Sequence, residues 1–186
     1  RDRSKEEVDS KLLNKEEHTI RMRIPVEGDI RFEDLVYGKI NTKCSEMDDL
    51  IIARSDGSPT YNLTVVVDDN DMNISHVIRG EDHISNTPKQ MLIYKALGWT
   101  IPKFGHLPMI LGSDGKRLSK RHGAKGTSEY KDLGYLPDTL INYLALLGWN
   151  PGNDDEIFDF NYLQENFSLD KVNKKSAVFD NTKLEW

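Results

Sequence analysis

Apolar and polar positions alternate along the first third of the chain. In residues 18–25, Ile20, Met22 and Ile24 share one face, which predicts a β-strand. The charged segment 4–13 predicts either a helix or a disordered lead-in. These patterns are typical of a small β-rich module, and further strands are predicted at 30–34, 36–40 and 50–54.

The pattern changes after the turn-forming break Ser-Asp-Gly-Ser-Pro at residues 55–59. Residues 61–67 are β-branched or apolar on both faces, which predicts a buried strand of a parallel sheet. Another strand is predicted at 76–79. Because ligands of open α/β sheets bind beyond the carboxyl ends of the strands, we expect residues 79–85 to lie at a binding site.

Helices are predicted for much of the second half of the chain. One helix is expected at 87–97, with Asn86 or Thr87 as its cap, Pro88 in its first turn and Gly98 at its end. The strand predicted at 104–111 leads into a glycine-rich loop, which shorter helices at 127–133 and 162–167 follow. Segment 137–147 is amphipathic, and the stripe that we expect in the core comprises Leu140, Ile141, Leu144 and Leu147.

Composition narrows the class of protein. The 186 residues have a formal net charge of −6, and no apolar run is long enough to span a membrane. The single cysteine, Cys44, excludes an internal disulfide and a cysteine-rich zinc site, and we expect it in the core. Asp68 and Asp69 are expected to be solvated turn residues rather than metal ligands. We therefore expect a cytoplasmic protein without membrane contact and without a zinc site.

Positive charge is concentrated in one loop of this acidic chain. Between Lys116 and Lys125 there are five basic residues and no acidic one, and glycines flank them. Such a loop can close over an anion and stabilise charge that grows in a transition state. A P-loop is excluded, because Gly112 and Gly115 are too close together and Arg117 stands where that motif has a hydroxyl. A solvated surface loop is the plain alternative.

The basic loop also resembles a known signature. Residues 117–121, Arg-Leu-Ser-Lys-Arg, resemble the KMSKS signature of class I aminoacyl-tRNA synthetases, with Arg117 in place of the usual first lysine. Continued through His-Gly-Ala at 122–124, the string resembles the version found in bacterial-type glutamyl-tRNA synthetases. Several blocks in the family's order are far more specific than one motif. The other matching blocks are 55–62, 67–69, 77–83, 106–108, 136–149 and 179–184.

This resemblance implies an α/β fold that contains part of a Rossmann-like class I catalytic domain. Residues 1–58 would belong to an α+β insertion that packs on the tRNA acceptor end. Residues 59–108 would form the second half of the Rossmann-like domain, and 109–186 the signature loop with an incomplete helical stem-contact domain. The family's HIGH-like motif and anticodon-binding region have no counterpart here. We therefore expect an internal fragment that is inactive alone.

The resemblance also implies a reaction. The family uses ATP, with its Mg²⁺, to convert glutamate to glutamyl-adenylate, and then transfers glutamate to the 3′ end of tRNA(Glu). Lys120 and Arg117 match the catalytic positions, whose cations stabilise the phosphates. Arg79 suits a glutamate carboxylate, and Tyr61 suits a wall of the same pocket. The residues matching the ATP site are Lys120, Arg117, Ser119, Met109, Ile110, His83 and Asp82.

Other interpretations stay open at this point. A glutamyl-queuosine-tRNA synthetase shares the adenylation step but would end near the signature loop, whereas the matching helical blocks continue beyond it. Glutaminyl enzymes share the architecture but typically have different residues around Arg79. A non-catalytic tRNA-binding module is favoured by the missing HIGH-like motif and disfavoured by the intact substrate-site blocks. We expect a monomer, and charging of tRNA(Gln) as well as tRNA(Glu) would be decided largely outside these residues.

Overall fold

The computed structural model describes residues 2–119 and 126–185. The chain forms two compact units, and each is assembled from separate stretches of sequence. Residues at the ends of several strands therefore belong to the same unit as the C-terminal part of the chain. The first unit comprises Arg1–Glu33, Lys39–Val77 and Ile84–Lys103, and the second comprises Asp34–Gly38, Ile78–His83 and Phe104–Trp186.

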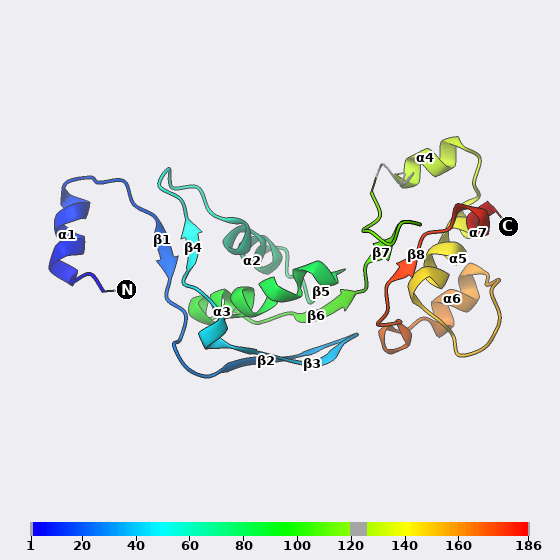
Figure 1. The fold of residues 1–186 in the computed structure, drawn as a ribbon, viewed down its shortest axis with the longest axis horizontal. Coiled ribbons are helices and arrows are strands. Elements are labelled where there is room, and N and C mark those ends of the chain that lie inside the picture. The colour runs from blue at the N-terminus through cyan, green and yellow to red at the C-terminus, as the bar shows by residue number, and fades with distance from the viewer. Residues whose placement is uncertain (1, 120–125, 186) are drawn as a thin grey trace. The chain divides into compact units, whose positions relative to one another are not determined.

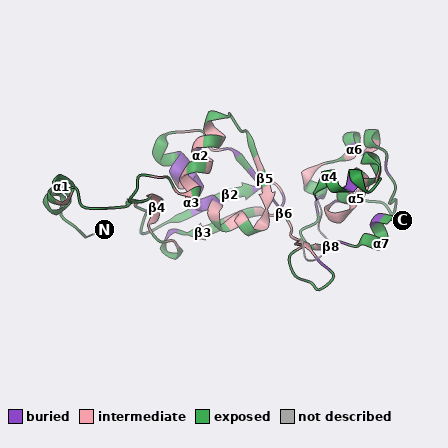
Figure 2. Ribbon diagram, turned by 90° about the horizontal axis from the view of Figure 1, so that it is seen from above, coloured by how far each residue is buried: buried purple, intermediate pink, exposed green. Residues whose placement is uncertain are grey.

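A helix and a two-stranded sheet begin the first unit (Figure 1). Of the two alternatives for this segment, the structure has the helix, α1 (Lys5–Leu13), whose N-cap Ser4 accepts the backbone N–H of Glu7 at 3.2 Å. Strand β1 (Ile20–Met22) pairs antiparallel with β4 (Leu50–Ala53). No residue of α1 is buried (Figure 2), so this helix is stabilised by its cap and its charges rather than by a core.

The prediction of a strand at 61–67 was wrong, because these residues begin helix α2 (Tyr61–Asp71). A run of valines is typical of a strand, but the spacing of the polar residues in this segment is that of a helix. The exposed positions recur every three or four residues, as they do on one face of a helix. They are Tyr61, Thr64, Asp68 and Asp71.

The opposite face of α2 supports the core of the first unit. Val66 is 1% exposed and packs with Ile93 and Tyr94 of helix α3 (Thr87–Leu97). This burial outweighs the low helix propensity of β-branched residues, which is at most about 0.7 kcal/mol per residue. Helix α3 ends as predicted, at Gly98 with a left-handed φ of 71°.

A four-stranded sheet has the strand order β3-β2-β6-β5. Strands β2 and β6 are parallel, and Asp34 lies opposite Phe104. The 3₁₀ turn Cys44–Glu46 follows β3 and buries Cys44, as expected. The strands are β2 (Asp29–Asp34), β3 (Gly38–Lys43), β5 (His76–Gly80) and β6 (Lys103–Leu107).

The strand predicted at 36–40 begins two residues later than expected. Val36 and Tyr37 instead form a turn, and their backbone N–H groups donate to Asp34 Oδ1 at 3.0 and 2.9 Å. A short acidic side chain that accepts bonds from the following residues favours a turn over a continued strand. The turn fixes the Asp34 carboxylate at the end of β2.

The C-terminal part of the second unit is mainly helical. Strand β7 (Ile110–Leu111) pairs in parallel with β8 (Ala177–Val178), which was not predicted. Two apolar clusters form its core, one around Trp149 and one around Tyr143. The helices are α4 (Thr127–Asp132), α5 (Pro137–Gly148), α6 (Phe160–Asn166) and α7 (Asn181–Glu185), with a 3₁₀ turn at Leu169–Lys171.

The buried stripe of α5 differs from the predicted one. Ile141 and Leu144 are 38% and 44% exposed, whereas Tyr143 is 5% exposed. Tyr143 packs in a cluster that includes Leu140 and Leu147, and its hydroxyl donates to the Asp180 carbonyl at 2.8 Å. A tyrosine whose hydroxyl has a partner can therefore take a core position that hydropathy alone assigns to leucine.

Two leucine substitutions test this packing in the full-length protein. Leu184, in the Tyr143 cluster, is 2% exposed, so Leu184→Ala should lower the free energy of unfolding by about 2–5 kcal/mol. The matched control Leu144→Ala should cost far less, because Leu144 is 44% exposed. Urea denaturation followed by circular dichroism measures both. Equal costs would contradict the assignment of the buried stripe.

Candidate functional site

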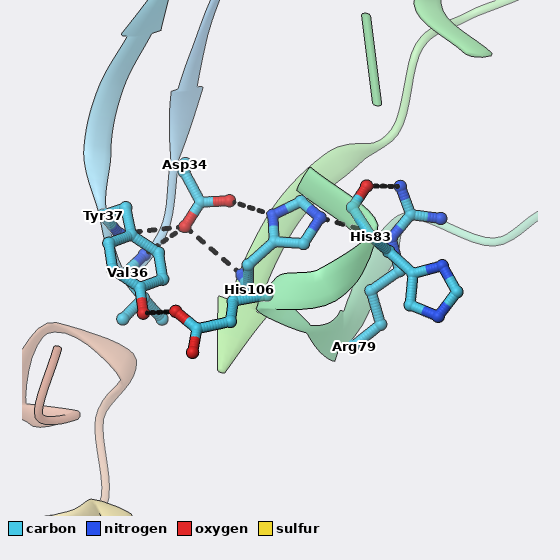
Figure 3. A network of polar contacts seen from close by, with 7 residues as sticks. Asp34, Val36, Tyr37, Arg79, His83 and His106 are labelled. Atoms are coloured by element: carbon cyan, nitrogen blue, oxygen red, sulfur yellow. Dashed lines mark hydrogen bonds and ion pairs between the residues drawn. The ribbon is translucent and has the colours of Figure 1, made fainter. Parts of the chain in front are cut away.

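Polar side chains gather where strands of the second unit end. Asp34 is the last residue of β2, Arg79 lies one residue before the end of β5, and His106 lies one residue before the end of β6. Figure 3 shows that they form one network, with the His106 ring between Asp34 and Arg79. A carboxylate, an imidazole and a guanidinium are thus brought together from segments far apart in the sequence.

Asp34 is the buried anchor of this network. It is 2% exposed, and its Oδ2 lies 2.6 Å from His106 Nδ1. Its Oδ1 accepts the His106 backbone N–H at 3.2 Å, in addition to the two bonds from the turn. Burial by itself would raise the pKa of Asp34, but the hydrogen bonds outweigh it and hold this pKa below its usual value. The carboxylate therefore stays ionised and fixed.

His106 connects this anchor to Arg79. The ring is 0% exposed, and its Nε2 accepts a hydrogen bond from Arg79 Nε at 3.2 Å. Because Nε2 is an acceptor, the ring proton lies on Nδ1 and is donated to Asp34. Burial lowers the pKa of His106, and the neighbouring Asp34 offsets only part of this effect. The ring is therefore neutral at pH 7.

The Arg79 guanidinium is held from several sides. Besides the bond to His106, its Nη2 donates to the His83 carbonyl at 3.5 Å. Its Cζ lies 5.7 Å from the centre of the Phe104 ring, within the range of a cation–π interaction. A half-buried guanidinium held in this way is suited to a planar anion such as a carboxylate.

A second arm of the network leads toward the basic loop. It starts in the 3₁₀ segment Glu81–Asn86 that follows β5. The Tyr37 hydroxyl donates to the Glu81 carboxylate, whose Oε1 accepts the backbone N–H of Met109 at 2.9 Å. Burial and the Glu81 carboxylate raise the pKa of Tyr37 to about 12, so the phenol keeps its proton. Glu81 thereby ties the residues after β5 to the segment that enters the basic loop.

The described part of the basic loop begins as a tight hairpin. The Leu118 N–H donates to the Ile110 carbonyl and the Gly112 N–H to the Lys116 carbonyl, both at 2.8 Å. Gly115 has a φ of 73°, the left-handed conformation that glycine adopts most readily. Arg117 Nη1 donates to Asp82 Oδ2 at 2.9 Å, and the Arg117 side chain is 69% exposed. The hairpin therefore presents an accessible arginine beside an acidic side chain.

The second unit brings together most of the residues predicted for the site. The Met109 N–H donates to Glu81, and Ser119 is half-buried. Tyr61 belongs to the first unit, where it is the first residue of α2 and is 51% exposed. Lys120, predicted as catalytic, lies outside the described residues. The predicted residues that share the second unit are Arg79, Asp82, His83, Met109, Ile110, Arg117 and Ser119.

Three residues of the network were not predicted at the site, namely Asp34, Tyr37 and His106, whereas Glu81 lies in the segment 79–85 that was expected there but had no role assigned. Two of them left a signal in the sequence. Asp34 ends a predicted strand and His106 interrupts an apolar one, so the sequence places both polar residues next to expected core positions. Both are buried in the structure, which is uncommon for polar residues. Their partnership has no such signal, because it depends on the pairing of β2 with β6.

Comparison with known proteins decides the family. The family described as tRNA synthetases class I (E and Q), catalytic domain, matches residues 1–186. The chain belongs to this family. The mixed α/β fold agrees with such a catalytic domain, as the resemblance predicted.

Individual members of the family match closely over most of the chain. The chain is 55% identical over 167 residues to a glutamate–tRNA ligase of Nitratidesulfovibrio vulgaris, covering 90% of this chain and 36% of that protein. It is 57% identical over 167 residues to glutamate–tRNA ligase 1 of Syntrophus aciditrophicus, covering 90% of this chain and 35% of that protein. The chain thus spans about a third of the length of these relatives.

A solved structure of the same family has a closely similar fold. The glutamate–tRNA synthetase of Elizabethkingia anophelis superposes with a TM-score of 0.86 at 35% sequence identity, covering 99% of this chain and 41% of that one.

Within residues 2–119 and 126–185, no helix combines the length and hydropathy of a membrane span. The same residues contain no group of three or more side chains placed to hold a metal ion.

The buried histidine predicts how stability depends on pH. An unfolded histidine titrates near pH 6.5, and the pKa of His106 is lower in the folded protein. Below about pH 6.5 the unfolded chain therefore binds more protons than the folded one, and the free energy of unfolding falls with the pH. Asp34, whose pKa is also lowered, adds to this loss only below about pH 4.

Thermal melting of the full-length protein between pH 8 and pH 5 measures this dependence. His106→Gln should flatten the fall in melting temperature, because the titrating ring is gone. His18→Gln is the control, since it removes an exposed histidine in place of the buried one. An unaltered slope in His106→Gln would show that the ring does not titrate as inferred.

Proposed function

We propose that the protein containing this chain is a glutamate–tRNA ligase. It activates glutamate with ATP to form glutamyl-adenylate and transfers glutamate to the 3′ end of tRNA(Glu). The observation that carries this proposal is Arg79, a half-buried guanidinium fixed at a strand end in a chain that is 55% identical to a glutamate–tRNA ligase. The chain covers 36% of that relative, so the activity belongs to the longer protein.

Arg79 is the proposed partner of a glutamate carboxylate. A fixed arginine recognises a planar carboxylate through two parallel hydrogen bonds, and its partial burial strengthens the attraction. Asp82 and His83, which lie in the 3₁₀ segment directly after β5, are proposed to border the substrate and ATP. Tyr61 is proposed to contribute a wall of the glutamate pocket. Recognition would thus depend on one fixed cation rather than on a cluster of mobile ones.

The basic loop is the proposed phosphate site. In the first reaction step, a glutamate carboxylate oxygen attacks the α-phosphorus of ATP, the bond to the bridging oxygen breaks, and pyrophosphate leaves. Negative charge grows on the phosphate oxygens, so positioned cations lower the barrier. Lys120 and Arg117 are proposed to supply these cations, and Ser119 a hydroxyl hydrogen bond. Met109 and Ile110 are proposed to border the adenine, and Mg²⁺ would arrive bound to the ATP phosphates.

The Asp82–Arg117 ion pair suits this assignment. It is solvent-exposed, so its net stabilisation is about 0–1 kcal/mol. ATP phosphates carry more negative charge than one carboxylate and can displace Asp82 from Arg117 at little cost. Asp82 would in this way keep Arg117 close to the site until the ATP phosphates replace Asp82 as its partner.

Several broader features complete the proposal. Residues 1–58 are proposed to belong to the insertion on the acceptor end of the tRNA. Residues 59–108 are proposed as the second Rossmann half, and 109–186 as the signature loop and stem-contact region. The whole enzyme is proposed to be a cytoplasmic monomer that uses ATP with Mg²⁺ and has no zinc site in this part of its chain.

The direct test is ATP–pyrophosphate exchange by the full-length protein, with tRNA(Glu) present. We expect exchange that depends on glutamate and that is far weaker with glutamine, because the proposed site holds a cation and glutamine has no second carboxylate to pair with it. Equal exchange with glutamine would contradict the proposed substrate. No exchange with any amino acid would favour a non-catalytic tRNA-binding protein.

Arg79→Ala tests the substrate site itself. Loss of the charged partner of a partly buried carboxylate should cost about 2–5 kcal/mol in kcat/KM for glutamate, which is roughly 30- to 4,000-fold. The KM for ATP should change little. Arg31→Ala is the matched control, because Arg31 makes an exposed ion pair with Asp29. Loss of ATP binding with an unchanged KM for glutamate would place Arg79 in the nucleotide site.

A further inference from the structure

We propose that Asp34 and His106 are positioning residues that hold Arg79 ready for its carboxylate ligand. Neither residue is predicted to touch substrate, and both act through Arg79. The inference rests on the proposed role of Arg79 in binding glutamate. It goes beyond that role, because it names what sets the orientation of the guanidinium before the substrate arrives.

Backbone hydrogen bonds hold the Asp34 carboxylate in one position. Its Oδ1 accepts three backbone N–H groups at 2.9–3.2 Å, from Val36, Tyr37 and His106. These donors come from the turn after β2 and from β6 itself. A shift of the carboxylate would leave buried N–H groups without an acceptor, which is costly in a site that excludes water. The position of Oδ2 is therefore set by the backbone.

The Oδ2 atom of Asp34 sets the tautomer of the His106 ring. The Asp34 oxygen, 2.6 Å from Nδ1, is an acceptor when ionised, so the neutral ring carries its proton on Nδ1. Nε2 is then left with a lone pair directed at Arg79 Nε, 3.2 Å away. The other tautomer would direct an N–H at the N–H of the arginine. The carboxylate thus decides whether the histidine attracts or repels Arg79.

The Arg79 guanidinium is contacted both at its Nε edge and on its flat face. His106 holds the Nε edge, and the Phe104 ring lies 5.7 Å from the guanidinium carbon. The Phe104 and His106 rings are themselves nearly parallel, at 11°, with centroids 6.4 Å apart. An arginine oriented in advance loses less conformational freedom when a ligand binds. The arrangement should therefore act on glutamate binding rather than on ATP binding.

Asp34→Asn is the most selective test, carried out in the full-length enzyme by ATP–pyrophosphate exchange. Asparagine keeps the size of the side chain and an oxygen for the three backbone N–H groups. Its amide, however, donates to Nδ1 and moves the ring proton to Nε2, which then faces Arg79. We expect the KM for glutamate to rise on the order of 10²-fold, as for a misplaced binding group. The KM for ATP should stay near wild type.

Further variants separate a positioning role from a merely structural one. Asp29→Asn is the matched control, since Asp29 makes an exposed pair with Arg31, and it should leave both KM values unchanged. His106→Ala should raise the KM for glutamate, and His106→Gln should largely restore it, because the glutamine carbonyl offers Arg79 an acceptor. Adding Asp34→Asn to His106→Gln should have little further effect, because no ring tautomer is left to change.

The outcomes distinguish this inference from the proposed function. A wild-type KM for glutamate in Asp34→Asn, or a parallel rise of both KM values with a lowered melting temperature, would overturn the positioning role. So would full additivity with His106→Gln, or failure of His106→Gln to improve on His106→Ala. If Arg79→Ala itself leaves glutamate use unchanged, the proposed glutamate site fails first. If Arg79→Ala strongly impairs glutamate use but neither Asp34→Asn nor His106→Ala does, the positioning role is rejected and the proposed glutamate site stands.

Discussion

The hydrogen bond between Asp34 and His106 is the interaction on which the candidate site depends. Both side chains are buried, and a buried carboxylate is tolerated only when donors satisfy it. The turn after β2 and the backbone of β6 supply those donors, so the site cannot form without the parallel pairing of the two strands. A local fold feature, one turn at a strand end, thereby sets the protonation and the orientation of groups that reach Arg79.

One short segment joins the two halves of the proposed chemistry. Residues 79–83 contribute Arg79, the proposed partner of glutamate, as well as Glu81, which accepts from Met109, and Asp82, which pairs with Arg117. The Asp82 side chain folds back over Gly80, where an added Cβ would lie 2.5 Å from an Asp82 carboxylate oxygen. The amino-acid and phosphate sites can therefore be held in register through the backbone. This coupling suits a reaction in which a carboxylate must meet the α-phosphorus in line.

Much of the helical structure and the family could be predicted from the sequence, because caps, glycine stops and ordered motif blocks are local signals. Residues 61–67 show where local signals fail: a run of valines predicts a strand, but packing against α3 and the spacing of four exposed residues make a helix. The Asp34–His106 contact joins residues 72 positions apart and follows from strand pairing, which one sequence does not reveal. Tyr61 and Arg79 were predicted as one pocket from resemblance, and that remains a proposal.

The central claim is that an ionised Asp34 keeps a neutral His106 with its proton on Nδ1. Nitrogen-15 NMR of the histidine rings in the full-length protein, with His106 assigned by substitution, measures this directly. The account predicts a neutral Nδ1–H ring at pH 7, with or without glutamate, and the opposite tautomer in Asp34→Asn. A protonated ring at pH 7, or an Nε2–H ring in the wild-type protein, would contradict it.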